Sequence, residues 1–246
     1  MKTLKIVVYI LKNEFRNKQA VIFSLMLPIV LLILMGTTDK DQVGYFYPGI
    51  VAIAFGTMGL VGISSQITGY LERDVFKRII VTDQRIGSFI LMDCMAQVLF
   101  MSIQFILITV VARLGYNAKF DIDVRYFSLM IVEIVLGMIS LMSIGVIIGG
   151  IAKNTKTAST IGNAVMVVML FVGNTLFPSD GWPKIIRVAA KYLPMNNLTD
   201  AMRRTLILHT QSVHQAFFQI SCLSVCAIVG LALGILLTGR NAVAAH

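Results

Sequence analysis

The sequence predicts an all-α integral membrane protein with six transmembrane helices. Hydrophobic residues make up 57% of the chain and charged residues only 13%, which is about half of the charged share of soluble domains. A water-soluble fold of this length could not bury so much apolar surface. Six apolar runs are each close to or above the roughly 17–25 residues that a helix needs to cross the hydrocarbon core, and they lack the alternation typical of membrane β-barrels. The runs are 20–36, 48–70, 86–112, 126–151, 160–177 and 217–238.

The segment 1–19 predicts an amphipathic helix that lies in the membrane interface. Leu4 and Val8 fall on one helical face, whereas Lys5 and Lys12 fall on another, and such a helix turns its cations towards anionic headgroups. A secretory signal would show a small-residue cleavage pattern after the first apolar run, and the sequence has none there. We therefore expect an interfacial elbow helix, with a helical cytosolic stub as the alternative.

The distribution of lysine and arginine predicts the orientation, because these residues gather in cytoplasmic loops. With the N-terminus inside, the inner side collects twelve of them, whereas the short outer loops hold Lys40, Lys119 and Arg125 among aspartates. We therefore expect both termini in the cytoplasm. The membrane is expected to be the cell membrane, that is, the plasma or inner membrane. The net charge of +9 is then a topology signal and does not indicate nucleic-acid binding.

The loop 71–85 on the inner side is the most charged part of the chain between two runs. It holds seven charges within the fourteen residues 72–85. Val75, Ile79 and Ile80 could give a short helix an apolar stripe there. Such a helix suits docking to a soluble partner, and a solvated loop that only enforces topology is the alternative.

The segment 178–215, on the predicted outer side, is too long for a tight turn. Apolar and basic residues interleave over 184–193, which predicts a short amphipathic helix that ends before Pro194. We expect its isoleucines to rest on the spans and its cations to face water. A second short helix is expected to begin near Asn197, with Asp200 in its first turn. Together these would form a cap on the outer ends of the fifth and sixth runs.

Polar side chains inside the runs are candidates for a substrate path, because burying them in lipid is costly. They could instead join helices by hydrogen bonds. Asp93 and Glu133 favour such joining or an ion pair at a helix end. Asn163 and Asn174 are eleven residues apart, which places them nearly on one face of the fifth helix and fits either use. The candidate path residues are Ser64, Gln66, Asn163 and Asn174.

Two G-x-x-x-G pairs indicate close helix packing. Gly145 and Gly149 lie in the fourth run, and Gly230 and Gly234 lie in the sixth. Glycines at this spacing let two helix backbones approach closely. We expect these four residues to pack helices and not to contact a substrate.

Two stretches resemble the ABC-2 type transport permeases. The first is similar to the extracellular re-entrant region of that family, F-P-x(4)-P-x-x-I followed by L-P and D-A-M-R. Its matching residues are Phe177, Pro178, Pro183, Ile186, Leu193, Pro194, Asp200 and Arg203. The second is the inner loop, GYLERDVFKRIIVTDQR, which is similar to E-R-E-x-G-T-x-(E/K)-x-L-x-x-(S/T)-P. Its matching residues are Glu72, Arg73, Asp74, Lys77, Ile80 and Thr82, whereas Val75–Phe76, Asp83 and Asp93 depart from the pattern.

The resemblance covers the whole chain and implies the membrane subunit of an ATP-driven exporter. Its partners would be two ABC ATPase subunits and a second permease, identical or homologous. Loop 71–85 would dock the ATPase through Glu72, Arg73, Asp74, Lys77 and Arg78. Phe177, Pro178, Pro183, Leu193, Pro194 and Arg203 would belong to re-entrant helices in the extracellular cap. The second and fifth helices would border the path between the two permeases.

The chain itself carries no nucleotide, metal or catalytic signature. Its nearest approach to a phosphate loop, Gly149–Thr157, lacks the G-K-(S/T) ending. The histidines and cysteines do not stand at metal-ligand spacing. We therefore expect no catalytic residue, metal or cofactor on this chain, with ATP and Mg²⁺ bound by the partner ATPase.

Apolar walls with a few amides favour an amphipathic or lipophilic cargo, such as a drug, an antibiotic or a peptide. Efflux of an antibiotic would confer resistance. Export of a glycan or lipid-linked polysaccharide by the same family is the first alternative. An ion-coupled secondary transporter is the second, although such proteins usually show internal repeats and mid-membrane carboxylates. We find no repeat between residues 1–123 and 124–246.

Overall fold

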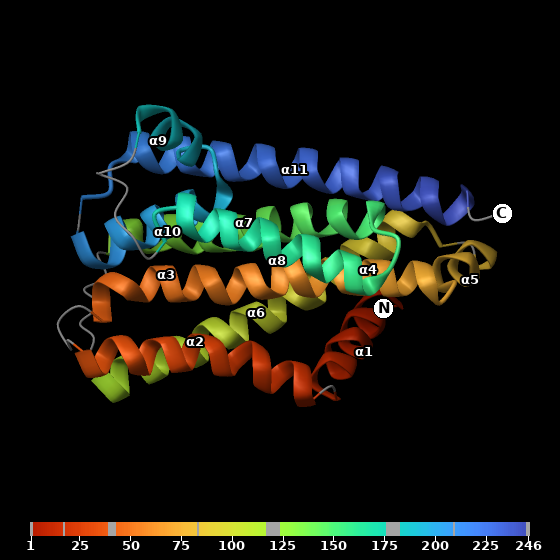
Figure 1. Cartoon of the computed structure of the whole chain (residues 1–246), viewed down its shortest axis with the longest axis horizontal. Coiled ribbons are helices and arrows are strands. Elements are labelled where there is room, and N and C mark those ends of the chain that lie inside the picture. The colour runs from red at the N-terminus through yellow and green to blue at the C-terminus, as the bar shows by residue number, and fades with distance from the viewer. Residues whose placement is uncertain are drawn as a thin grey trace.

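The computed structural model describes residues 2–16, 18–38, 43–82, 84–116, 124–175, 183–208 and 210–244, and every regular element within these ranges is a helix (Figure 1). In chain order the elements are α1 (Lys2–Arg16), α2 (Lys18–Thr38), α3 (Val43–Gly56), η2 (Thr57–Gly62), α4 (Ile63–Glu72), α5 (Val75–Val81), α6 (Ile86–Tyr116), α7 (Val124–Ile151), α8 (Thr155–Val172), α9 (Lys184–Ala190), α10 (Pro194–Arg203), η4 (Arg204–Leu208) and α11 (Val213–Ala244).

The prediction of an all-helical, multi-pass membrane protein is confirmed. Among the described residues, five helices are long and apolar enough to cross a membrane. They are Val43–Glu72, Ile86–Tyr116, Tyr126–Ile151, Thr155–Val172 and Val213–Ala242. The first predicted run, 20–36, lies within α2, where the apolar stretch Ser24–Thr37 is shorter than a full span. Six spans therefore remain a prediction.

One continuous helix forms the axis of the bundle. It comprises α3, η2 and α4, and it widens to π-helical geometry over Thr57–Gly62 before it resumes as α4. α2, α6, α7, α8 and α10 all contact it. Its α3 part is almost wholly buried, as expected for a helix that is apolar on every side.

Glycines allow the backbones of α7 and the axis helix to lie in direct contact. A Cβ atom on Gly145 of α7 would collide with the carbonyl oxygen of Gly59, and one on Gly149 would lie 2.8 Å from the carbonyl oxygen of Ser64. On α11, a Cβ atom on Gly234 would lie 2.7 Å from Cγ1 of Val146. The packing role predicted for the G-x-x-x-G pairs is therefore confirmed.

The two ends of the bundle differ. α5 and the C-terminal part of α11 lie at one end, where α1 also begins, and α9 and α10 lie at the other (Figure 1). α1 crosses the bundle obliquely, and its buried Val7 and Ile10 pack against Met92 and Ala96 of α6. Its opposite face is exposed, including Tyr9.

The second helix of the cap begins earlier than the sequence suggested. Pro194 is its first residue, because proline has no N–H to leave unpaired there and its φ already suits a helix. Asp200 therefore lies in the second turn and not in the first. The apolar residues of α10, including Met195 and Leu198, are fully buried.

The first cap helix, α9, does not rest on the spans as expected. Ile185 is 84% exposed and Val188 is 48% exposed, and only Ala190 of this helix is buried. The physical reason is that α10 takes the place against the bundle, where it packs on α3, α7 and α11. The expected apolar stripe of α9 is thus largely exposed among the described residues, although α9 contacts α8.

Gly145→Ala is expected to lower the free energy of unfolding by roughly 1–3 kcal/mol, because the added methyl group forces α7 away from the axis helix. The measurement is the apparent melting temperature of the purified chain in detergent. Gly239→Ala is the matched control, since a Cβ atom there meets nothing within 4 Å. Equal melting temperatures for the two variants would contradict the packing described here.

Candidate functional site

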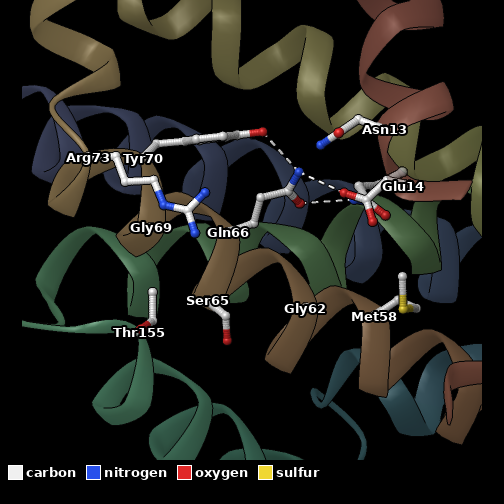
Figure 2. Close-up of a pocket in the computed structure, with 11 residues that line it drawn as sticks. Asn13, Glu14, Met58, Gly62, Ser65, Gln66, Gly69, Tyr70, Arg73 and Thr155 are labelled. Carbon is white, nitrogen blue, oxygen red and sulfur yellow. Dashed lines mark hydrogen bonds between the residues drawn. The ribbon is translucent and has the colours of Figure 1, made fainter. Parts of the chain in front are cut away.

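A cavity of about 370 Å³ lies beside the turn between α4 and α5, and Figure 2 shows the residues around it. It is lined by α1, the axis helix, α6 and the first residue of α8. Its lining residues are Asn13, Glu14, Met58, Gly62, Ser65, Gln66, Gly69, Tyr70, Arg73, Gln97 and Thr155. We call it the inner cavity.

Gln66 is the centre of a hydrogen-bond network beside this cavity. Its Nε2 atom lies 2.9 Å from Oε1 of Glu14, 3.0 Å from the hydroxyl of Tyr70 and 3.2 Å from Oδ1 of Asp93. The Tyr70 hydroxyl donates to the same Asp93 oxygen at 3.1 Å, and Nε2 of Gln97 donates to Oε1 of Gln66 at 2.9 Å. These five residues form the inner polar cluster, which joins α1, α4 and α6.

The inner polar cluster holds two carboxyl groups without a cation bound to them. Asp93 is fully buried, and among the described residues no lysine or arginine forms an ion pair with it or with Glu14. Burial raises the pKa of the Glu14 carboxyl, and hydrogen bonds from Gln97 and Gln66 partly offset that rise. Asp93 thus joins α6 to α4 by hydrogen bonds, as the sequence predicted, and not by an ion pair.

The residues predicted to dock the ATPase lie around the turn between α4 and α5. Glu72 ends α4 and accepts a hydrogen bond from the backbone N–H of Thr155 at 3.0 Å. Asp74 has a positive φ of 54°, a backbone region that aspartate adopts more readily than most residues. Its carboxylate pairs with Lys77 at 2.9 Å. Arg73 and Arg78 are exposed, and Arg73 also lines the inner cavity.

Phe76 anchors α5 to the bundle. Its side chain is 1% exposed, and its ring packs edge-to-face against Tyr70 at 5.9 Å and against Phe89 at 6.1 Å between centroids. The expected stripe was therefore wrong at Ile80, which is 49% exposed. Phe76 takes that role, and its spacing of three from Ile79 could have indicated it.

Of the four candidate path residues, Gln66 alone lines the inner cavity. Ser64 donates to the carbonyl oxygen of Ala158 at 3.3 Å, which joins the axis helix to α8. Asn163 is exposed on α8. Asn174 lies beyond the end of α8, with a φ of 51°, so the expected shared helical face with Asn163 is wrong.

The cap residues differ in what they contact. Phe177 and Pro178 lie outside the described residues. Pro183 precedes α9 and is exposed, and Leu193 is half-buried before α10. Arg203 is only 4% exposed, so this cation faces inwards.

Arg203 ties the cap to two other helices. Its guanidinium donates to the carbonyl oxygens of Asn174 and Thr175, both at 3.3 Å, just after α8. It also lies 4.3 Å from the ring centroid of Tyr45 at the start of α3. Carbonyl groups at a helix C-terminus and an aromatic face both attract a cation. Arg203 thus fixes α10 beside the N-terminal end of α3 and the C-terminal end of α8.

A second chain of polar side chains crosses the end of the bundle that carries α9 and α10, and sequence reasoning missed it as a unit. Asp200 accepts from Arg204 at 2.7 Å and from Gln219 at 3.0 Å. Gln211 donates to Gln219 at 3.0 Å and to the buried Glu133 at 3.1 Å. We call this the outer polar chain. Gln211 precedes α11 whereas Gln219 lies within it, so no helical period in the sequence could have linked the two.

A comparison with protein families agrees with this architecture. The family model described as ABC-2 type transporter matches residues 4–207. The matched range contains the inner cavity, α5 and the cap helices α9 and α10. No curated protein matches the chain.

Proposed function

Because the chain belongs to the ABC-2 type transporter family, we propose that it is the membrane subunit of an ATP-driven exporter. Members of this family are permeases of the ABC type and normally work with ABC ATPases. In this proposal ATP and Mg²⁺ bind to a separate ATPase, and the cargo is an amphipathic or lipophilic molecule such as a drug, an antibiotic or a peptide.

The observation that carries the proposal is the link between α5 and the inner cavity. α5 presents exposed charges, which suit a soluble partner, yet Phe76 holds it against Tyr70. The hydroxyl of Tyr70 in turn bonds to Gln66 and Asp93. A displacement of α5 by the ATPase would therefore be transmitted to the groups around the cavity. This is what a permease driven by a separate ATPase requires.

The cavity also suits the proposed cargo. Its lining combines a carboxyl group at Glu14, amides at Gln66 and Gln97, and the apolar side chain of Met58. Ligand sites commonly pair apolar surface with a few placed polar groups that fix orientation. A molecule with one polar and one apolar end would match this lining better than a long polar glycan.

The orientation in the proposal places α5 and both termini in the cytoplasm and the cap outside the cell membrane. α5 and the end of α11 lie at the same end of the bundle (Figure 1). Exposed cations gather there, including Arg73, Arg78 and Arg240, as the positive-inside rule expects. The ATPase would then reach the loop 71–85 from the cytoplasm.

A second permease would cover the exposed face of α8. Of the spans found by length and composition, α8 is among the least buried, and Asn163 and Val167 are exposed along one face of it. An amide such as that of Asn163 is poorly accommodated by lipid but bonds readily to another helix. The two permeases would then enclose the path between them.

Arg73→Glu/Arg78→Glu is expected to weaken copurification of the ATPase about tenfold, equal to about 1.4 kcal/mol, because two exposed cations at the docking turn become repulsive. The matched control is Lys184→Glu/Arg187→Glu, which reverses two exposed cations of α9. Normal ATPase recovery with the α5 variant would reject the docking site. Loss with the α9 variant alone would reverse the proposed orientation.

A photoreactive benzophenone amino acid at Val167 is expected to form a covalent adduct with a second permease, because that position faces out of α8 beside Asn163. The adduct is measured by gel mobility and identified by mass spectrometry. The same amino acid at Val229, which is 50% exposed on α11, should give no such adduct. An adduct at Val229 but not at Val167 would place the partner on the wrong helix for this proposal.

A further inference from the structure

We propose that the inner cavity binds a primary ammonium group of an amphipathic molecule, with Glu14 as its counter-ion and Oε1 of Gln97 as its hydrogen-bond acceptor. The inference rests on the proposed function and names the chemical class of the cargo. It follows from a shortage of hydrogen-bond donors in the inner polar cluster.

The orientation of each amide in the cluster follows from its neighbour. Nε2 of Gln66 faces oxygens of Glu14 and Asp93, which suits the acceptors of a carboxylate. The Oε1 atom of Gln66 then faces Gln97, which must present its own Nε2 atom. The Oε1 atom of Gln97 therefore receives no hydrogen bond from the cluster.

Two buried acceptors in the cluster have no donor. Oε1 of Gln97 and Oδ2 of Asp93 find no partner among the described residues, although their side chains are only 2% and 0% exposed. Gln97 also lines the inner cavity. Buried acceptors are normally paired with a donor from the protein, a water molecule or a ligand. This acceptor thus belongs to a residue of the cavity wall, and a donor of a bound molecule that reached it would satisfy it.

The charge at this site favours a cationic donor. Glu14 and Asp93 share the single Nε2 atom of Gln66, so ionisation of both would place two negative charges close together. Arg73 lines the cavity on the far side of Gln66 from Glu14 (Figure 2), and it forms no ion pair with Glu14. A primary ammonium group supplies both a positive charge and three N–H donors.

The cavity has room for the rest of such a molecule. Gly62 and Gly69 belong to its lining. A Cβ atom on Gly62 would lie 3.7 Å from the carbonyl oxygen of Thr57 and 3.8 Å from Sδ of Met58, both ordinary contact distances, so the site accepts a side chain. The Met58 side chain lies beside it and can contact an alkyl chain. A larger side chain at position 62 would therefore extend into the cavity beside Met58.

The test uses the full chain in nanodiscs of phosphatidylcholine and phosphatidylglycerol. The probe is dodecylammonium with a photoreactive diazirine near the nitrogen, and its trimethylammonium and alcohol analogues are compared with it. Cross-linked peptides are mapped by mass spectrometry. Glu14→Gln removes the charge, Gly62→Leu fills the space, and Glu133→Gln in the outer polar chain is the matched control.

The ammonium probe is expected to label peptides from α1 and the axis helix at least fivefold more than either analogue. Glu14→Gln and Gly62→Leu should each reduce that labelling at least fivefold, whereas Glu133→Gln should not. Glu14→Gln should also keep or raise the melting temperature, because its amide supplies a donor that the cluster lacks. Equal labelling by the alcohol, or unchanged labelling in Glu14→Gln, would overturn the proposal.

Competition distinguishes two sources of the ammonium group. Loss of labelling when phosphatidylethanolamine replaces phosphatidylcholine would identify a lipid headgroup as an occupant. Persistent labelling would identify a free amphiphilic amine. The assay contains no ATPase, so its outcome is independent of the charge-reversal experiment on α5. Amine binding could thus fail while the exporter proposal stands, and the reverse also holds.

Discussion

Polar side chains within a bilayer must find their partners inside the protein, because the hydrocarbon core offers no water. This constraint explains where the helices are joined. The inner polar cluster around Gln66 brings α1, α4 and α6 together, and the outer polar chain around Asp200 joins α7, α10 and α11. Between these two layers the contacts are mostly apolar, with glycines setting the closest approaches. Apolar packing brings helices together, whereas the hydrogen bonds specify which faces meet.

The axis helix connects the two layers. Near its N-terminal end Tyr45 receives the buried Arg203 of α10, and near its C-terminal end Gln66 and Tyr70 carry the inner polar cluster. The π-helical segment η2 lies between them, and such segments often occur at functional sites. Because the turn before α5 follows this helix directly, a force of the proposed ATPase on α5 would act on a helix that reaches both ends of the bundle.

Much of this fold could be predicted from the sequence, because run length, glycine spacing and amphipathic period are local properties. The partners of Gln66 could not be, since the sequence gives the helical face of a residue but not how separate helices are rotated towards one another. Arg203 resembles a surface cation until the carbonyl groups after α8 are seen to accept from it. α8 ends at Val172, before Asn174. Asn163 and Asn174 therefore do not share a helical face, because residues beyond a helix end no longer follow its period.

The central claim is that α5 acts on the inner cavity through Tyr70. Tyr70→Phe tests it most directly, because the ring keeps its contacts with Phe76 and Phe89 while the hydroxyl bond to Asp93 is lost. ATPase recovery, ATP hydrolysis and export are measured on one reconstituted preparation. The account predicts normal ATPase recovery and hydrolysis with export reduced several-fold. Normal export in this variant would contradict it.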